Sequence, residues 1–257
     1  MSASSNVKEE FLDLENGRLR IRRKGGGQPL LYLHGSHGMT VWLPFLDELA
    51  QRFEVIAPDH PGFGQSDASS SMDNIADLAR VHLELLDRLG GNKTHLVGHC
   101  IGGWMAMEVA LRSPLVASLT LINSAGIHVD AQKGDFFMCT PANLPKMMFS
   151  DVALGRRYFD EERAADDAVQ YRNRVMAAKL GWHPRLFDLH LHKWLHRIRI
   201  PVQVLWGEEN RVLPKEFGAG LSQALRGPLT LIPKAGHFAH VERAAECAKQ
   251  VQSFIER

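Results

Sequence analysis

A cysteine stands at the centre of a pattern that presents a nucleophile at a tight turn between a strand and a helix. Residues 98–103 are Gly-His-Cys-Ile-Gly-Gly, so Cys100 has glycine two positions before and after it. Such glycines let neighbouring backbones pass closely, and the central side chain projects at the N-terminus of the next helix. The pKa of a thiol, about 8.5, falls beside a helix N-terminus or an imidazolium. The pattern predicts that Cys100 is a thiolate nucleophile, alkylated before Cys139 and Cys247; a buried structural cysteine is the alternative.

The elements that would position this cysteine alternate along the chain. Short apolar runs typical of buried strands are separated by stretches with helical spacing, which predicts a mostly parallel, doubly wound α/β sheet. Ahead of them, Asn16-Gly17 lies between two strand-like runs and predicts an antiparallel N-terminal hairpin. The predicted strands are Leu30–Leu33, Val55–Ala57, His95–Val97, Leu119–Ile122, Val202–Trp206 and Leu229–Ile232, and the helices are Trp42–Arg52, Asn74–Leu89, Ile101–Arg112, Lys215–Leu225 and Arg243–Arg257.

One long interval contains no strand-like run. Residues 127–198 consist of helix-like polar pieces and a segment rich in methionine and phenylalanine. A gap of this length is uncommon in a compact domain unless it is functional. We expect residues 127–198 to form a helical cap over the carboxyl ends of the strands, with residues 1–126 and 199–257 as the core. Helices that merely pack on the surface are the alternative.

Several motifs together resemble the α/β-hydrolase family over nearly the whole chain. The turn at Cys100 resembles the family's nucleophile elbow. The segment His34–Gly38 resembles its oxyanion loop, which implies that backbone N–H groups of Ser36 and Ile101 hold the developing negative charge. Gly236-His237 occupies the loop position of the family's catalytic histidine, which implies that His237 is the base. The resemblance implies the α/β-hydrolase fold and a capped ester or carbon–carbon bond hydrolase.

The chain departs from the family pattern at the nucleophile and at the acid, and one chemical reason can explain both changes. The usual nucleophile is serine, and the usual acid position holds Asn210; the strand end where some members place the acid also carries an amide, Asn123. Loss of the carboxylate from a serine triad costs about 10⁴ in rate. A thiol needs less help, and an amide can orient its histidine, as in Cys-His-Asn proteases. We therefore predict a catalytic set of Cys100, His237 and Asn210.

Other interpretations stay open at this stage. Glu208 or Glu209 could replace the missing acid if the loop is twisted. The pocket could belong to a ligand-binding protein that no longer catalyses a reaction, or to a non-hydrolytic enzyme on the same fold, such as a lyase or a cofactor-free oxygenase. Whether Cys100 and Asn210 are natural or engineered also stays open.

The composition of the predicted cap indicates a small hydrophobic substrate, because flexible apolar side chains suit such ligands. We expect an ester, lactone or thioester to be hydrolysed, or its acyl group transferred, through an acyl-cysteine, with no cofactor. The predicted substrate-binding residues are His37, Trp104, Met138, Met148, Trp182 and Phe238.

The overall composition argues against several other classes of function. The net charge is +1 with no basic patch, so we expect no nucleic-acid partner. No secretory signal or membrane-length apolar run is evident, so we expect a cytoplasmic protein without a membrane partner. Three widely spaced cysteines suggest neither disulfides nor zinc. His192 and His196 could share a helical face, but we expect no metal there. A homodimer stays open.

Overall fold

The computed structural model describes residues 6–131 and 134–257, and within them a single sheet forms the centre of the fold. The sheet has eight strands in the order β1-β2-β4-β3-β5-β6-β7-β8. The hairpin β1 (Lys8–Leu14) and β2 (Gly17–Lys24) is antiparallel, and β2 also pairs antiparallel with β4 (Glu54–Pro58). The remaining pairings are parallel. The predicted mostly parallel sheet with an N-terminal hairpin is confirmed.

Each predicted strand run lies within an observed strand. β5 and β7 are buried throughout, as apolar runs in the centre of a parallel sheet should be. The other parallel strands have mostly buried residues except β8, which lies at the sheet edge. The strands not yet given are β3 (Pro29–Leu33), β5 (Thr94–His99), β6 (Val116–Ile122), β7 (Val202–Gly207) and β8 (Leu229–Ile232).

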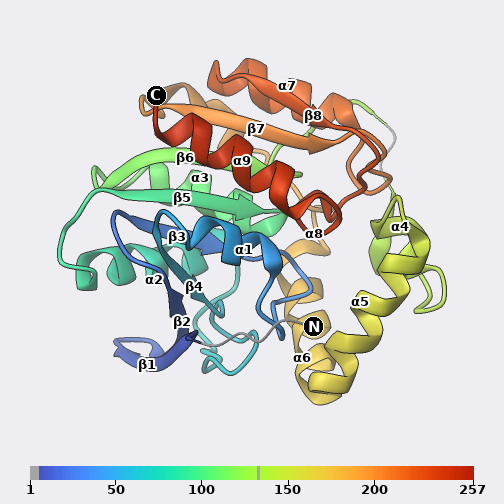
Figure 1. Ribbon diagram of the computed structural model, residues 1–257, viewed down its shortest axis with the longest axis horizontal. Coiled ribbons are helices and arrows are strands. Elements are labelled where there is room, and N and C mark those ends of the chain that lie inside the picture. The colour runs from blue at the N-terminus through green and yellow to red at the C-terminus, as the bar shows by residue number, and fades with distance from the viewer. Residues whose placement is uncertain (1–5, 132–133) are drawn as a thin grey trace.

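Helices cover both faces of the sheet. Figure 1 shows α1 and α9 in front of the strands and α2 and α3 behind them. The side chain of Asn74 caps α2 by accepting a hydrogen bond from the Asp77 N–H at 3.0 Å, so this helix begins where the sequence predicts. The core helices are α1 (Pro44–Leu49), α2 (Ile75–Arg88), α3 (Ile101–Ala110), α7 (Lys215–Leu225), α8 (Ala239–Glu242) and α9 (Ala244–Ile255).

The interval between β6 and β7 is helical, and in its described residues the one β contact is an isolated bridge between Gly126 and Phe187. Figure 1 shows α4, α5 and α6 together at the end of the molecule toward which the strand arrows point. The division into a core and a cap at residues 127 and 198 stays a prediction. The segments are η1 (Phe136–Met138), α4 (Leu144–Met148), α5 (Val152–Ala165), α6 (Asp167–Gly181), η2 (Leu191–Lys193) and η3 (Leu195–Arg197).

Three buried histidines support the loop that follows β3. His60 Nε2 donates to the carbonyl oxygen of His34 at 2.9 Å, so His60 Nδ1 is the acceptor for Nε2–H of His82 at 2.8 Å. The Nε2 atom of His34 accepts from the backbone N–H of His60 at 3.1 Å. Burial lowers the pKa of His34 to about 3 and holds the pKa values of His60 and His82 well below the usual range. This chain of neutral imidazoles fixes the start of the predicted oxyanion loop.

These histidines predict an acid-sensitive fold. Below about pH 6.5 these histidines are protonated in the unfolded chain but stay neutral in the folded protein. The free energy of unfolding therefore decreases as the pH falls, by up to about 1.4 kcal/mol per pH unit for each histidine. We expect His82→Gln to reduce the slope of unfolding free energy against pH by about that amount between pH 5 and 6.5. Urea unfolding at several pH values measures both slopes. Identical slopes would mean that His82 is protonated in the folded protein.

Candidate active site

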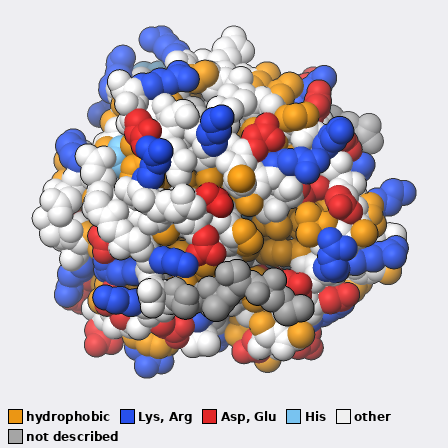
Figure 2. Space-filling model, viewed as in Figure 1, with side chains coloured by type: hydrophobic (Ala, Val, Ile, Leu, Met, Phe, Trp, Pro, Cys, Tyr) orange, Lys and Arg blue, Asp and Glu red, His pale blue; other side chains and the backbone are white. Residues whose placement is uncertain are grey.

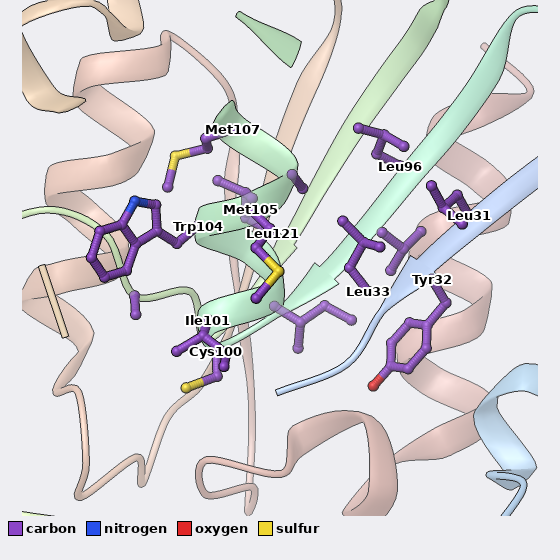
Figure 3. Close-up of a cluster of buried hydrophobic side chains, with 14 of the residues drawn as sticks. Leu31, Tyr32, Leu33, Leu96, Cys100, Ile101, Trp104, Met105, Met107 and Leu121 are labelled. Atoms are coloured by element: carbon purple, nitrogen blue, oxygen red, sulfur yellow. The ribbon is translucent and has the colours of Figure 1, made fainter. Parts of the chain in front are cut away.

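The turn between β5 and α3 has the geometry of a nucleophile elbow. Cys100 has φ 53° and ψ −118°, in the left-handed region that side chains rarely adopt. A Cβ on Gly98 would lie 2.5 Å from the carbonyl oxygen of Gly102, and one on Gly102 would lie 2.1 Å from that of Leu33. Glycine is therefore required on both sides of Cys100. Figure 3 shows Cys100 at this turn, with Trp104 and Met107 farther along α3.

The thiol of Cys100 is shielded from solvent, and nearby N–H and O–H groups act on it. Cys100 is fully buried, and burial raises the pKa of its thiol to about 11. Hydrogen bonds from the backbone N–H groups of Ser36 and Ile101 and from the Ser36 hydroxyl lower the pKa but do not offset burial. The expectation of a resting thiolate with a depressed pKa is therefore wrong, because desolvation of the charged form exceeds the effect of the donors. The two residues predicted for the oxyanion hole are nevertheless the ones that favour the charged form of this thiol.

His237 is oriented by the amide predicted to replace the acid. Its Nδ1 atom lies 3.3 Å from Oδ1 of Asn210. That oxygen also accepts from the backbone N–H groups of Val212 at 3.0 Å and Leu213 at 3.1 Å, and Nδ2 of Asn210 donates to Asn123. The atom facing His237 is thus an acceptor, so Nδ1 carries the proton and Nε2 has the free lone pair.

The imidazole of His237 is neutral in this environment. Burial is the largest cause that lowers its pKa well below the usual range, followed by charge repulsion with His99 and His37. Across the described part of the chain, no hydrogen bond joins His237 to the Cys100 sulfur. The expected resting pair of thiolate and imidazolium is therefore replaced by a neutral thiol and a neutral imidazole.

The glutamates considered as substitute acids point elsewhere. Glu209 accepts a hydrogen bond from the Ser150 hydroxyl at 2.7 Å and lies 3.7 Å from the Arg211 guanidinium, and Glu208 is exposed. The group on Nδ1 of His237 is Asn210. The structure thus favours the amide over either carboxylate as the group that orients the histidine.

The loop that carries His237 is held by hydrogen bonds to two other segments, the end of α4 and the His99 side chain. The carbonyl oxygen of Met148, at the end of α4, accepts from the N–H of His237 at 2.7 Å and from that of Phe238 at 3.2 Å. Below the loop, Nε2 of His99 donates to the carbonyl oxygen of His237 at 2.9 Å. His240, three residues after His237, places its Nε2 2.9 Å from the Tyr32 hydroxyl.

Two cavities open between α6 and the predicted oxyanion loop, with volumes of about 360 and 160 Å³. Both are lined by His37, and the larger also by Ser36 and Trp182. Cys100 and His237 are absent from the described lining. The ring of His37 lies 5.9 Å from that of Phe136 and 5.3 Å from that of Phe159, measured between centroids. Of the residues that line the larger cavity, Ser36 also acts on the Cys100 thiol.

The structure brings some predicted substrate-binding residues to the cavities and not others. His37 and Trp182 line them, whereas Met138 is 69% exposed and Trp104 and Met148 are buried. Phe238 is buried and stacks on Phe149, with centroids 5.0 Å apart. For the four residues that are not in the described lining, substrate contact stays a prediction.

Sequence reasoning missed the face of α6 that borders the larger cavity. Tyr171, Val175 and Ala178 lie on this face at helical spacing and line the cavity together with Trp182, which was predicted. Tyr171 and Val175 are strongly exposed, as is Trp182. Figure 2 shows hydrophobic side chains exposed among basic ones over the region of the cap helices. Exposed apolar spacing on a cap helix was the available signal. Arg174 lies beside this stripe and lines both cavities.

The alternative of a metal site at His192 and His196 gains no support from local geometry. The two residues lie on separate 3₁₀ helices, η2 and η3, so they do not share an α-helical face. No group of three or more metal-ligating side chains gathers in residues 6–131 and 134–257. In the same residues, no helix is long and apolar enough to cross a membrane.

Comparison with known proteins agrees with this geometry. Residues 30–250 match the family described as the alpha/beta hydrolase family. The chain belongs to this family. The resemblance and the fold class predicted from the sequence are thereby confirmed, and the match supports an enzyme, whereas the cysteine mechanism stays a prediction.

Individual relatives cover nearly the whole chain. The chain is 32% identical, over 90% of its length, to a dihydrolipoyllysine-residue acetyltransferase component of an acetoin cleaving system from Pseudomonas putida, and spans 64% of that relative. It is 28% identical to a 2-hydroxy-6-oxononadienedioate/2-hydroxy-6-oxononatrienedioate hydrolase from Burkholderia vietnamiensis, covering 98% of this chain and 94% of that one. A serine hydrolase structure from Cycloclasticus zankles has the same fold, with a TM-score of 0.84, 19% identity and 98% of each chain covered.

Burial predicts an order of alkylation opposite to the one expected from the sequence. Cys139 is partly exposed, whereas burial raises the pKa of Cys100 to about 11 and of Cys247 to about 12. We expect iodoacetamide to label Cys139 first when no substrate is present, because the buried thiols are neither accessible nor ionised at pH 8. Peptide mass spectrometry over time measures the three rates. Fastest labelling at Cys100 would show that the cap opens readily and that its thiol is activated.

Proposed function

We propose that this protein cleaves an ester, lactone or thioester through a thioester on Cys100, with water or another nucleophile as the final acceptor. One observation carries the proposal: Cys100 is held in a left-handed elbow, where the N–H groups of Ser36 and Ile101 lower the pKa of its thiol. Donors at that point can stabilise an oxyanion that forms on an attacked carbonyl. A buried structural cysteine needs neither the strained backbone nor the two donors.

The proton transfers of the proposed reaction begin from a neutral Cys100 thiol and a neutral His237 imidazole. As the sulfur bonds to the substrate carbonyl carbon, Nε2 of His237 takes the thiol proton, and Asn210 holds the proton on Nδ1. The oxyanion collapses, the leaving group departs with the proton from Nε2, and the acyl group remains on Cys100. Water then loses a proton to Nε2 and attacks the thioester. Collapse releases the carboxylic acid and returns the proton to the sulfur.

An activated ester tests the covalent step. We expect 4-nitrophenyl butyrate to release nitrophenol catalytically and to add one butyryl group to Cys100, detectable in the intact mass after acid quench. Cys100→Ala should lose both signals, with turnover reduced by at least about 10³-fold. Cys139→Ala is the matched control and should keep both, because Cys139 lies outside the elbow.

The other outcomes separate the alternatives. Turnover without a Cys100 adduct, retained in Cys100→Ala, would contradict the covalent mechanism and favour a different reaction on this fold. Ligand binding with neither turnover nor adduct would favour a retired binding protein. Faster release of the acyl group to added dihydrolipoamide than to water would favour acyl transfer, which the name of the Pseudomonas putida relative brings into consideration.

The cavities also support a substrate that carries an anionic group. Arg174 lines both, and no carboxylate in the described ranges forms an ion pair with it. The remaining lining of the larger cavity is mainly aromatic and aliphatic. The name of the Burkholderia vietnamiensis relative denotes a hydrolase of dicarboxylates. We therefore extend the proposal to an apolar acyl compound with a carboxylate at the end that faces the cavity mouth.

Arg174→Met separates this charge preference from general binding. We expect KM for 4-nitrophenyl hydrogen glutarate, a monoester with a free carboxylate, to rise about 10-fold, since a charge-assisted hydrogen bond is lost. KM for neutral 4-nitrophenyl butyrate should stay within about twofold. Arg172→Met, on an exposed part of α6 outside the cavity lining, is the control. Equal changes for both esters would exclude a carboxylate-binding role for Arg174.

A further inference from the structure

Asn123, directly after β6, connects the two loops that carry Asn210 and His237. Its Oδ1 accepts from the backbone N–H of Gly207 at 2.9 Å and from Nδ2 of Asn210 at 3.0 Å. Its Nδ2 donates to the carbonyl oxygens of Gly236 at 3.2 Å and His237 at 2.8 Å. The side chain is fully buried. Two donations and two acceptances use the full hydrogen-bonding capacity of the buried amide in these directions.

We propose that Asn123 is a positioning residue that selects an amide at position 210 and thereby sets the tautomer of His237. The inference rests on the proposed function of the Cys100 site, because it assigns His237 as the base. Asn123 acts through Asn210 and through the His237 backbone, and it touches no reacting atom.

The orientation of the Asn123 amide cannot be reversed without loss of hydrogen bonds. Exchange of its oxygen and nitrogen would place Oδ1 against two carbonyl oxygens and Nδ2 against the N–H of Gly207. Four favourable contacts would be replaced by at least three contacts between like groups. The atom that Asn123 presents to position 210 is therefore an acceptor.

An acceptor on Asn123 requires a donor on residue 210. Nδ2 of Asn210 supplies it, which leaves Oδ1 toward Nδ1 of His237. An aspartate at this position would place a carboxylate oxygen about where Nδ2 lies, opposite Oδ1 of Asn123. The contact is favourable only if that carboxyl group keeps a proton. The acid that the family normally carries is thus disfavoured here by one buried neighbour.

A two-by-two set of variants tests this coupling. Asn210→Asp is made in the wild-type background and in Asn123→Gly, because glycine tolerates the φ of 47° at position 123. At pH 8 we expect the shift in melting temperature caused by Asn210→Asp to be more favourable by about 5 °C in the Asn123→Gly background. Equal shifts in both backgrounds would overturn the proposal. Exposed Asn92→Asp is the matched control and should give equal shifts.

The same variants differ in how their stability depends on pH. In Asn210→Asp, Oδ1 of Asn123 opposes ionisation of the new carboxyl group, whereas the N–H groups of Val212 and Leu213 and the His237 ring favour it. The contact with Asn123 raises the pKa of this carboxyl group relative to its value in the Asn123→Gly background. We therefore expect Asn210→Asp to lose more stability as the pH rises from 5 to 8 when Asn123 is present than when it is replaced by glycine. A purely structural Asn123 would leave the two pH profiles parallel.

A measurement on the wild-type protein keeps the inference testable if Asn123→Gly does not fold. Nitrogen-15 NMR of labelled imidazoles reports which nitrogen of His237 carries the proton, with the signal assigned by its absence in His237→Gln. We expect Nδ1–H in the wild type, and a smaller but still major population of Nδ1–H in Asn123→Gly, because Val212 and Leu213 still donate to Oδ1 of Asn210 there. An Nε2–H tautomer in the wild type would overturn the proposal. The readout needs no turnover, so a missing acyl adduct together with the expected tautomer would contradict the proposed function alone.

Discussion

The hydrogen bond between His237 and Asn210 is the interaction on which the rest of the site depends, because it decides which imidazole nitrogen can act as a base. The bond fixes the tautomer of His237 only if the amide oxygen of Asn210, and not its nitrogen, faces the ring. Two backbone N–H groups and Asn123 ensure that it does. Helix α4 takes part as well, since the carbonyl oxygen of Met148 accepts a hydrogen bond from the N–H of His237. The loop of His237, the end of β6 and helix α4 are thus coupled through a few buried hydrogen bonds.

Burial explains why a neutral pair suits this site better than an ion pair. A thiolate and an imidazolium would each be desolvated here, and the directions of both pKa shifts oppose their formation. An amide beside His237 does not stabilise an imidazolium as a carboxylate would. In the proposed mechanism, charge therefore develops only during the reaction, where the N–H groups of Ser36 and Ile101 would stabilise it, and not in the resting protein. The thiol of Cys100, the amide of Asn210 and the exclusion of solvent all favour an uncharged resting site.

Local patterns in the sequence were enough to predict the strands, the core helices and the elbow. Apolar runs and the helix cap at Asn74 depend on near neighbours, and the glycines around Cys100 report a local steric need. Contacts between distant segments were beyond such reasoning. The four bonds of Asn123 reach residues 84 to 114 positions away, and the complete burial of Cys100 depends on how the whole chain packs. The thiol pKa was predicted in the wrong direction because the dipole is local, whereas desolvation depends on the whole fold.

The strain at Cys100 also bears on whether this pocket still reacts. A side chain at φ 53° costs on the order of 1–2 kcal/mol that glycine would avoid, and such strain concentrates where a side chain must point in one direction. Here that direction leads to two backbone donors. A binding pocket would gain nothing from a strained, buried thiol, nor from a histidine held in one tautomer. The combination is explained if the sulfur must reach a carbonyl carbon while the carbonyl oxygen reaches the donors.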